Sequence, residues 1–178
     1  MAALLAIVIV FILIIQFYHF KPTSSIKKEN SEILFSLGDS SNLTGDVPVG
    51  SIVIYNDQII GTGFNTFNRN GDIGGHAEIN AISSAIKKTG IKNFRMMNRD
   101  SLFLITTYEP CKMCVGAILE YNIKNVIFEK PKSISERTKS YMREFRYEVQ
   151  KTWSGTDTLQ ELLFMRNDEY RKQKENGN

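Results

Sequence analysis

Residues 107–117 read Thr-Tyr-Glu-Pro-Cys-Lys-Met-Cys-Val-Gly-Ala and stand at the end of an apolar run that begins at Leu102. Cys111 and Cys114 are the only cysteines among 178 residues, so a disulfide framework is excluded. Two cysteines at this spacing have three interpretations: half of a zinc site, a redox pair, or two unrelated core residues on one helical turn. The rest of the chain must decide between them.

A second short stretch, Gly75-His-Ala-Glu-Ile79, supplies the missing partner. His76 opens a predicted helix that runs to Lys88, and Cys111 opens another that runs to Tyr121. Two thiolates and one imidazole make three zinc ligands, which leaves the fourth position of a tetrahedral ion for water, as in catalytic sites. The only other histidine, His19, lies in an apolar segment.

His-x-Glu combined with Pro-Cys-x-x-Cys is the signature of the zinc deaminases. Here it assigns His76, Cys111 and Cys114 to Zn2+ and Glu78 to proton transfer. Zinc would lower the pKa of its water. Glu78 would pass protons from that water to the ring nitrogen and the leaving amine of a nucleobase, so that ammonia departs and a carbonyl remains. This conjunction outweighs the redox and core interpretations of the cysteines.

The surrounding chain predicts an α/β domain. Two β-rich runs, Val49 to Tyr55 and Gln58 to Phe64, flank Asn56-Asp57 and predict a hairpin. Strands over Leu102 to Thr107 and Val126 to Glu129 alternate with the two helices, which gives the order β-β-α-β-α-β. This order is typical of a three-layer α/β/α sandwich around a central mixed sheet. A polar loop is expected over 65–75, a short helix near 29–38 and a terminal helix over 159–173.

An unbroken apolar run covers Ala2 to Ile15, and the first charged side chain is Lys21. About 20 helical residues span roughly 30 Å, the thickness of a bilayer's hydrocarbon core, so a transmembrane helix is expected over 1–20. A cleaved signal peptide is one alternative, but no basic residue precedes the run and no Ala-x-Ala-like site follows it. A buried core helix is a weaker one, because in so small a protein a helix that is apolar on all sides is more often in lipid. Because basic residues only follow the run, the positive-inside rule predicts a single-pass membrane protein with its catalytic domain in the cytoplasm.

Beyond the signature, the chain resembles the cytidine/deoxycytidylate deaminase superfamily, and most closely the bacterial tRNA-specific adenosine deaminases. The resemblance adds Asp46-Val-Pro-Val-Gly50 and Ile60-Gly-Thr-Gly-Phe-Asn65 to the two stretches quoted above. Asn80 makes the stretch His-Ala-Glu-Ile-Asn-Ala similar to the corresponding stretch of deoxycytidylate deaminases. The resemblance implies a zinc hydrolase that forms a homodimer, with Asn65 bound to the substrate base and the backbone around Pro110 helping to orient it. The expected domains are a transmembrane helix (1–20), a linker with a short helix (21–45) and the deaminase domain (46–178).

The leading functional hypothesis is deamination of a nucleobase, with tRNA adenosine as the family's nearest precedent. Deamination of a free base, nucleoside or nucleotide (guanine, cytosine or deoxycytidylate) is the alternative, and a membrane-tethered module without turnover is a third hypothesis. The net charge of +3 is too small to argue for a nucleic acid. The basic stretch from Lys130 to Lys151 could contact tRNA phosphates, although a solvated helix face or contact with anionic lipid is the stronger interpretation.

Overall fold

The computed structural model describes residues 7, 10, 26–150, 160, 163, 164, 166, 167, 171 and 172. The chain forms two compact units, Met1–Pro131 and Lys132–Asn178. The candidate site lies in the first unit.

The first unit is built on a mixed sheet whose described strands have the order β2-β1-β3-β4. These strands are β1 (Gly50–Tyr55), β2 (Gln58–Phe64), β3 (Leu102–Tyr108) and β4 (Asn125–Lys130). β1 pairs antiparallel with both β2 and β3, whereas β4 pairs parallel with β3. The predicted hairpin is confirmed: Asn56 and Asp57 join β1 to β2 with φ values of 48° and 62°, the positive angles that a tight hairpin turn requires.

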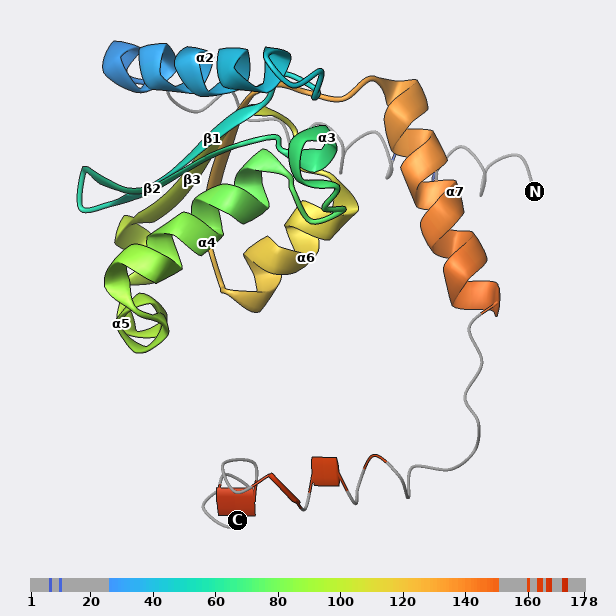
Figure 1. The fold of residues 1–178 in the computed structure, drawn as a ribbon. Helices are drawn as coiled ribbons and strands as arrows, with labels where there is room; N and C mark the ends of the chain where they lie inside the picture. The colour runs from blue at the N-terminus through green and yellow to red at the C-terminus, as the bar shows by residue number, and fades with distance from the viewer. Residues whose placement is uncertain are drawn as a thin grey trace. The chain divides into compact units, whose positions relative to one another are not determined.

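Helices cover both faces of this sheet (Figure 1). One face carries α2 (Lys28–Asn42), and the other carries α4 (Ala77–Thr89), α5 (Ile91–Met96) and α6 (Lys112–Glu120). A short helix, α3 (Phe67–Asn70), lies in the loop between β2 and α4. The helices expected over 76–88 and 111–121 are therefore present within one residue at each end.

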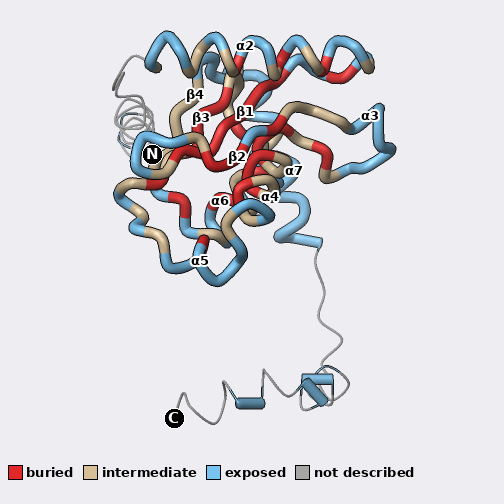
Figure 2. The backbone as a smooth tube through the Cα atoms, turned by 60° about the vertical axis from the view of Figure 1, so that its left-hand side comes forward, coloured by how far each residue is buried: buried red, intermediate tan, exposed pale blue. Residues whose placement is uncertain are grey.

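The core has two parts, one on each face of the sheet, because successive side chains of a strand point to opposite faces. Ile52 and Ile54 of β1 pack with Leu34 of α2. Val53, between them, packs on the other face with residues of α4 such as Ala81. Figure 2 shows the buried residues running through the central strands and along α4.

Two glycines of β2 allow α4 to lie directly on the sheet. A Cβ atom at Gly61 would collide with the carbonyl oxygen of Ala81, and one at Gly63 would collide with the carbonyl oxygen of Ala77. Only a residue without a side chain fits at either position. The start of α4 is therefore held close to the end of β2, next to the site described below.

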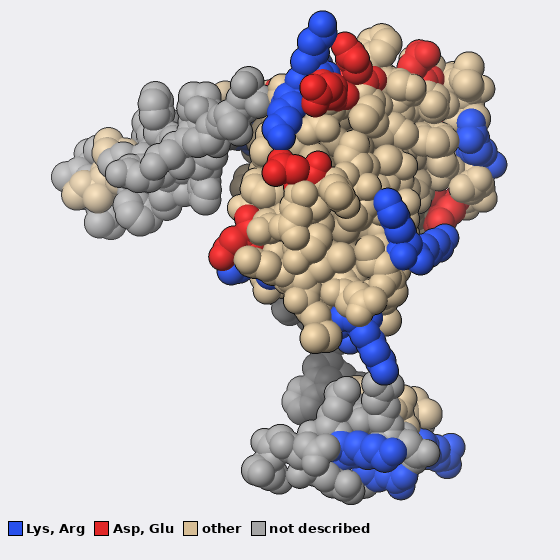
Figure 3. Space-filling model, turned by 90° about the vertical axis from the view of Figure 1, so that its left-hand side faces the viewer, with Lys and Arg blue, Asp and Glu red and all other residues tan. Residues whose placement is uncertain are grey.

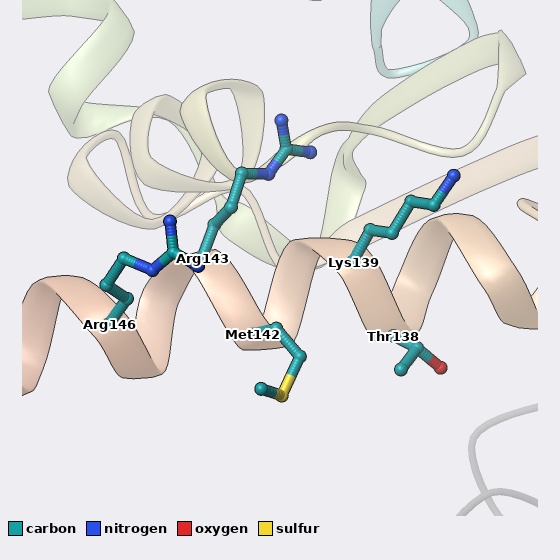
Figure 4. Close-up of a pocket in the computed structure, with 5 residues that line it drawn as sticks. All are labelled: Thr138, Lys139, Met142, Arg143 and Arg146. Carbon is teal, nitrogen blue, oxygen red and sulfur yellow. The ribbon is translucent and has the colours of Figure 1, made fainter.

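The second unit contains α7 (Ile134–Gln150), which begins with a capping box. The carboxylate of Glu136 accepts hydrogen bonds from the backbone N–H and the hydroxyl of Ser133, at 2.9 and 2.6 Å. Lys139, Arg143 and Arg146 project from one side of this helix in Figure 4, and Thr138 and Met142 project from another. No residue of α7 is buried.

The prediction of a transmembrane helix over 1–20 is corrected. Among the described residues, no helix is long enough and apolar enough to cross a membrane. Of the expected span, only Ile7 and Val10 are described, and the rest lies outside the described residues. The unbroken apolar run covers only residues 2–15, and such a length of helix spans about 21 Å, short of the roughly 30 Å of a hydrocarbon core. The predicted single-pass membrane location and the cytoplasmic placement derived from it are corrected together with that helix. The membrane partner is not shown.

Other differences concern helices. α2 is longer than the helix expected near 29–38, and α3 and α5 occupy segments for which no helix was expected. Most of the helix expected over 159–173 lies outside the described residues.

Candidate metal centre

The topology of the sheet brings two helix starts to one edge. Because β1 is antiparallel to both neighbours, β2 and β3 run in the same direction and end at the same edge. α4 follows β2 and α6 follows β3, so both helices begin there. His76 directly precedes α4 and Cys111 directly precedes α6, each in an extended backbone conformation.

Three side chains meet between these helix starts. Nδ1 of His76 lies 3.6 Å from Sγ of Cys111 and 3.5 Å from Sγ of Cys114. The two sulfur atoms lie 3.5 Å apart. Among the described residues, these three form the group that could hold a metal ion. The structure thus brings together the three residues that the sequence assigned to zinc.

The distances fit zinc. With bonds of about 2.3 Å to sulfur and about 2.05 Å to nitrogen at tetrahedral angles, two sulfurs would lie about 3.8 Å apart, and sulfur and nitrogen about 3.6 Å apart. The observed separations of 3.5 to 3.6 Å are within 0.3 Å of these values. Two sulfurs and one imidazole nitrogen are also ligands that zinc prefers.

The two cysteines differ in their affinity for protons. The hydrogen bond between them lowers the pKa of Cys111 to about 5, and His76 adds to this. The same hydrogen bond, together with burial, raises the pKa of Cys114. Zinc must displace any proton that remains on these sulfurs in order to bind both of them.

Glu78 is buried in the first turn of α4, with only 4% of its surface exposed. Burial raises the pKa of its carboxyl group, while hydrogen bonds from its own backbone N–H and from the Cys114 thiol act in the opposite direction. Cys114 and His76 both act on this pKa, so the carboxyl group lies near the cluster. It lies beside the three candidate ligands and is not one of them.

Asn65 follows β2 and is bonded at both ends of its amide. Its Oδ1 accepts a hydrogen bond from the backbone N–H of Ala77, and its Nδ2 donates to the carbonyl oxygen of Val47, each at 2.8 Å. The amide thereby joins the loop before β1 to the first residue of α4. Each end has one further hydrogen-bonding position, so these contacts leave the expected role in substrate binding open.

Pro110 is buried between the end of β3 and Cys111. The chain turns here from the sheet into α6, and the backbone N–H of Glu109 is fixed by the carbonyl oxygen of Lys130 in β4 at 2.9 Å. The segment that carries Cys111 is therefore anchored to the neighbouring strand.

Asp46 is a residue near the site whose role the sequence did not reveal. It is buried, and its carboxylate accepts hydrogen bonds from the Thr44 hydroxyl at 2.6 Å and the Asn68 backbone N–H at 2.7 Å. Burial by itself raises the pKa of Asp46, but these hydrogen bonds outweigh it and the pKa is lowered. Asp46 thus ties α3 to the loop before β1. In the sequence, Asp46 contributed only to the family resemblance of the stretch Asp46-Val-Pro-Val-Gly50, which did not indicate these hydrogen bonds.

Comparison with known proteins matches residues 26–130 to the family described as cytidine and deoxycytidylate deaminase zinc-binding region. The chain is similar to the tRNA-specific adenosine deaminase of Buchnera aphidicola subsp. Schizaphis graminum, with 42% identity over 84 residues, 47% of this chain and 52% of the relative. It is also similar to that of Haemophilus influenzae, with 35% identity over 109 residues, 61% of this chain and 60% of the relative. The chain thus spans little more than half the length of these curated relatives.

Solved structures show the same fold. The guanine deaminase of Bacillus subtilis has a TM-score of 0.59 at 22% identity, covering 80% of this chain and 95% of that one. A structure from a study of A-to-I editing by tRNA:A34 deaminases has a TM-score of 0.51 at 24% identity, covering 57% and 75%. The resemblance inferred from the sequence is confirmed.

Proposed function

Because the chain belongs to the cytidine and deoxycytidylate deaminase zinc-binding family, we propose that it is a zinc-dependent hydrolytic deaminase acting on adenosine in tRNA. The observation that carries the proposal is the cluster of His76, Cys111 and Cys114 with the buried carboxylate of Glu78 beside it. Both relatives described above are named for tRNA adenosine, and this supports the choice of substrate.

We assign zinc to Nδ1 of His76 and the two cysteine sulfurs. When bound, zinc lowers the pKa of a coordinated water and so makes it a nucleophile near neutral pH. The helix start that carries Cys111 and the one that carries His76 hold the three ligands in place. Loss of any one of them would remove the site.

Glu78 moves the protons. Its carboxylate takes a proton from water, whose oxygen adds to the carbon that bears the exocyclic amine, and returns protons to the ring nitrogen and the leaving nitrogen. The carbon–nitrogen bond breaks, ammonia leaves and a carbonyl forms, so that one water is consumed for each ammonia released. Burial raises the pKa of Glu78, which is the direction required of a carboxylate that must hold a proton near neutral pH.

We assign recognition of the base to Asn65 and to the backbone around Pro110. Asn65 is fixed by two hydrogen bonds, and each of its amide atoms can make one more. An amide presents both a donor and an acceptor, which suits the edge of a nucleobase. Because its bond to Ala77 is adjacent to both His76 and Glu78, a base held by Asn65 would lie beside the reacting centre.

Contact with tRNA requires local cations. Most of the face seen in Figure 3 is neither acidic nor basic, and its charged side chains lie in separate small groups of either sign, so this face offers no continuous positive surface. The exposed row of Lys139, Arg143 and Arg146 on α7 (Figure 4) is a group of three like charges on one helix. We assign phosphate contacts to this row.

The family resemblance further suggests a homodimer. We propose this assembly, and sedimentation of the zinc-loaded chain tests it by giving the mass of the particle in solution.

The test of the function is ammonia release by the purified, zinc-loaded chain from free bases, nucleosides, nucleotides and tRNA. Conversion of adenosine to inosine in tRNA is the expected result. Turnover of free bases or nucleotides alone would contradict the substrate. The absence of turnover with every substrate, at full zinc occupancy, would contradict deamination itself.

A further inference from the structure

Asn80 binds the chain on both sides of Asn65. It lies on α4 one turn beyond His76, and its backbone N–H donates to the His76 carbonyl oxygen at 2.9 Å. Its side-chain Nδ2 donates to the carbonyl oxygen of Phe64 at 2.8 Å and to the hydroxyl of Thr66 at 3.1 Å. The two hydrogens of an amide nitrogen allow both bonds at once.

The packing of β2 on α4 makes this reach possible. At Gly63, just before Phe64, a Cβ atom would lie 2.8 Å from the Cβ of Asn80, so strand and helix touch at this point. Asn80 is half-buried here. An apolar side chain at this position would leave the Phe64 carbonyl oxygen without its side-chain donor, which is costly for a group withdrawn from water.

These bonds form part of a closed circuit around the start of α4. Asn65, held from both sides by Asn80, accepts a hydrogen bond from the N–H of Ala77. The N–H of Thr66 donates to the carbonyl oxygen of Gly75 at 2.8 Å, which closes the loop that leads to His76. Strand end, loop and helix start are therefore connected through one amide side chain.

We propose that Asn80 is a positioning residue that sets the direction of the Asn65 amide and the path of the 66–75 loop, without touching the substrate. The inference rests on the proposed function where it concerns substrate binding. Loss of the Asn80 amide would free the carbonyl oxygen of Phe64 and the hydroxyl of Thr66. The Asn65 amide would then present its free donor and acceptor in varying directions, while the metal ligands and Glu78 stay in place.

Two variants at position 80 and one matched control test the proposal. Asn80→Ala removes the amide. Asn80→Asp keeps the size of the side chain but replaces the donor with an acceptor, and it carries the test if the alanine variant does not fold. Asn93→Ala is the control, because Asn93 of α5 also donates its Nδ2 to a backbone carbonyl oxygen, that of Thr89, at 2.8 Å, but is exposed and outside the circuit.

The first readout, amide hydrogen exchange in the zinc-loaded protein, is independent of activity. Exchange at the N–H groups of Thr66 and Ala77 should become about tenfold faster in both Asn80 variants, the factor expected for loss of one hydrogen bond. The Asn93→Ala variant should leave them unchanged. Unchanged exchange in the Asn80 variants would overturn the proposal.

The second readout is steady-state kinetics at equal zinc content. The Asn80 variants should raise KM about tenfold, and more than they lower kcat, because Glu78 and the ligands are untouched. Loss of zinc together with activity, or parent-like behaviour of Asn80→Asp, would overturn the positioning role. If the parent deaminates nothing, the proposed function fails, and the exchange measurement alone decides whether Asn80 holds the loop.

Discussion

Nδ1 of His76 lies 3.5 Å from Sγ of Cys114, although 38 positions separate the two residues along the chain. Each residue belongs to the start of a helix that follows one of two strands pointing the same way. The sheet therefore determines that imidazole and thiolate meet, and the sequence determines which side chains are there.

Removal of a ligand should remove the metal. His76→Ala and Cys111→Ala are expected to lose zinc and activity together, while Met113→Ala, a change between the cysteines at an exposed position, should keep both. Zinc at about 100 times its Kd stabilises a folded protein by about 2.7 kcal/mol, so added zinc should raise the Tm of the parent and not that of the ligand variants. Metal analysis and thermal unfolding check this. A ligand variant that retains zinc at the parental level would refute the assignment.

Close packing of β2 on α4 should make Gly63 intolerant of a side chain. Gly63→Ala places a Cβ against the carbonyl oxygen of Ala77, and we expect a loss of about 1–3 kcal/mol in the free energy of unfolding. Gly116→Ala in α6 meets open space. Because alanine has a higher helix propensity than glycine, Gly116→Ala should raise the free energy of unfolding by up to about 1 kcal/mol. Denaturant unfolding measures both, and equal effects would contradict the packing argument.

Asp46 should contribute to stability in a pH-dependent manner. Since its pKa is lowered in the folded state, folding favours the carboxylate, and the contribution is present above the ordinary value of 3.8 and lost as the pH falls through the lowered value. Asp46→Asn should therefore lower the free energy of unfolding most near neutral pH. The difference in this free energy between variant and parent should shrink below pH 3.8. Asp39→Asn, on the exposed side of α2, is the control. A difference independent of pH would contradict the prediction.

The basic row on α7 should contribute to tRNA affinity through phosphate contacts. Replacing Lys139, Arg143 and Arg146 with alanine should weaken binding and reduce the slope of log affinity against log salt by about two to three, since each phosphate contact contributes about 0.7–0.9. The control replaces three exposed cations elsewhere, Lys87, Lys92 and Arg95. Filter binding at several salt concentrations measures the slopes. Equal slopes for the two triple variants would argue against a specific role for α7.

Features that depend only on residues adjacent in the sequence could be predicted. Asn56-Asp57 specified its turn because both residues tolerate positive φ. Gly90 ended α4 as expected, with φ 81°, but the sequence did not reveal that α5 begins at the next residue. A helix of six residues has too few positions to show periodicity. The prediction of a membrane helix was wrong. It took residues 1–20 as the span, whereas the unbroken apolar run covers only residues 2–15.

The candidate ligands could be predicted because each half of the site is a short motif. The contacts that position them could not. Asn80 reaches Phe64 and Thr66 only because Gly63 brings strand and helix together, and no local pattern encodes that approach. Asp46 likewise reaches Asn68 only because the pairing of β1 with β2 brings the residues before β1 close to those after β2.

The most direct test of the account is the rate of deamination by zinc-loaded Glu78→Gln. Glutamine keeps the shape of the side chain and removes the carboxylate that transfers protons, while His76, Cys111 and Cys114 remain to hold the metal. The variant should contain as much zinc as the parent and bind the base, yet turn over more slowly by at least the factor of about 10² to 10⁴ typical of a positioned acid or base. Turnover near the parental rate, with zinc in place, would contradict the role of Glu78 and the proposed mechanism.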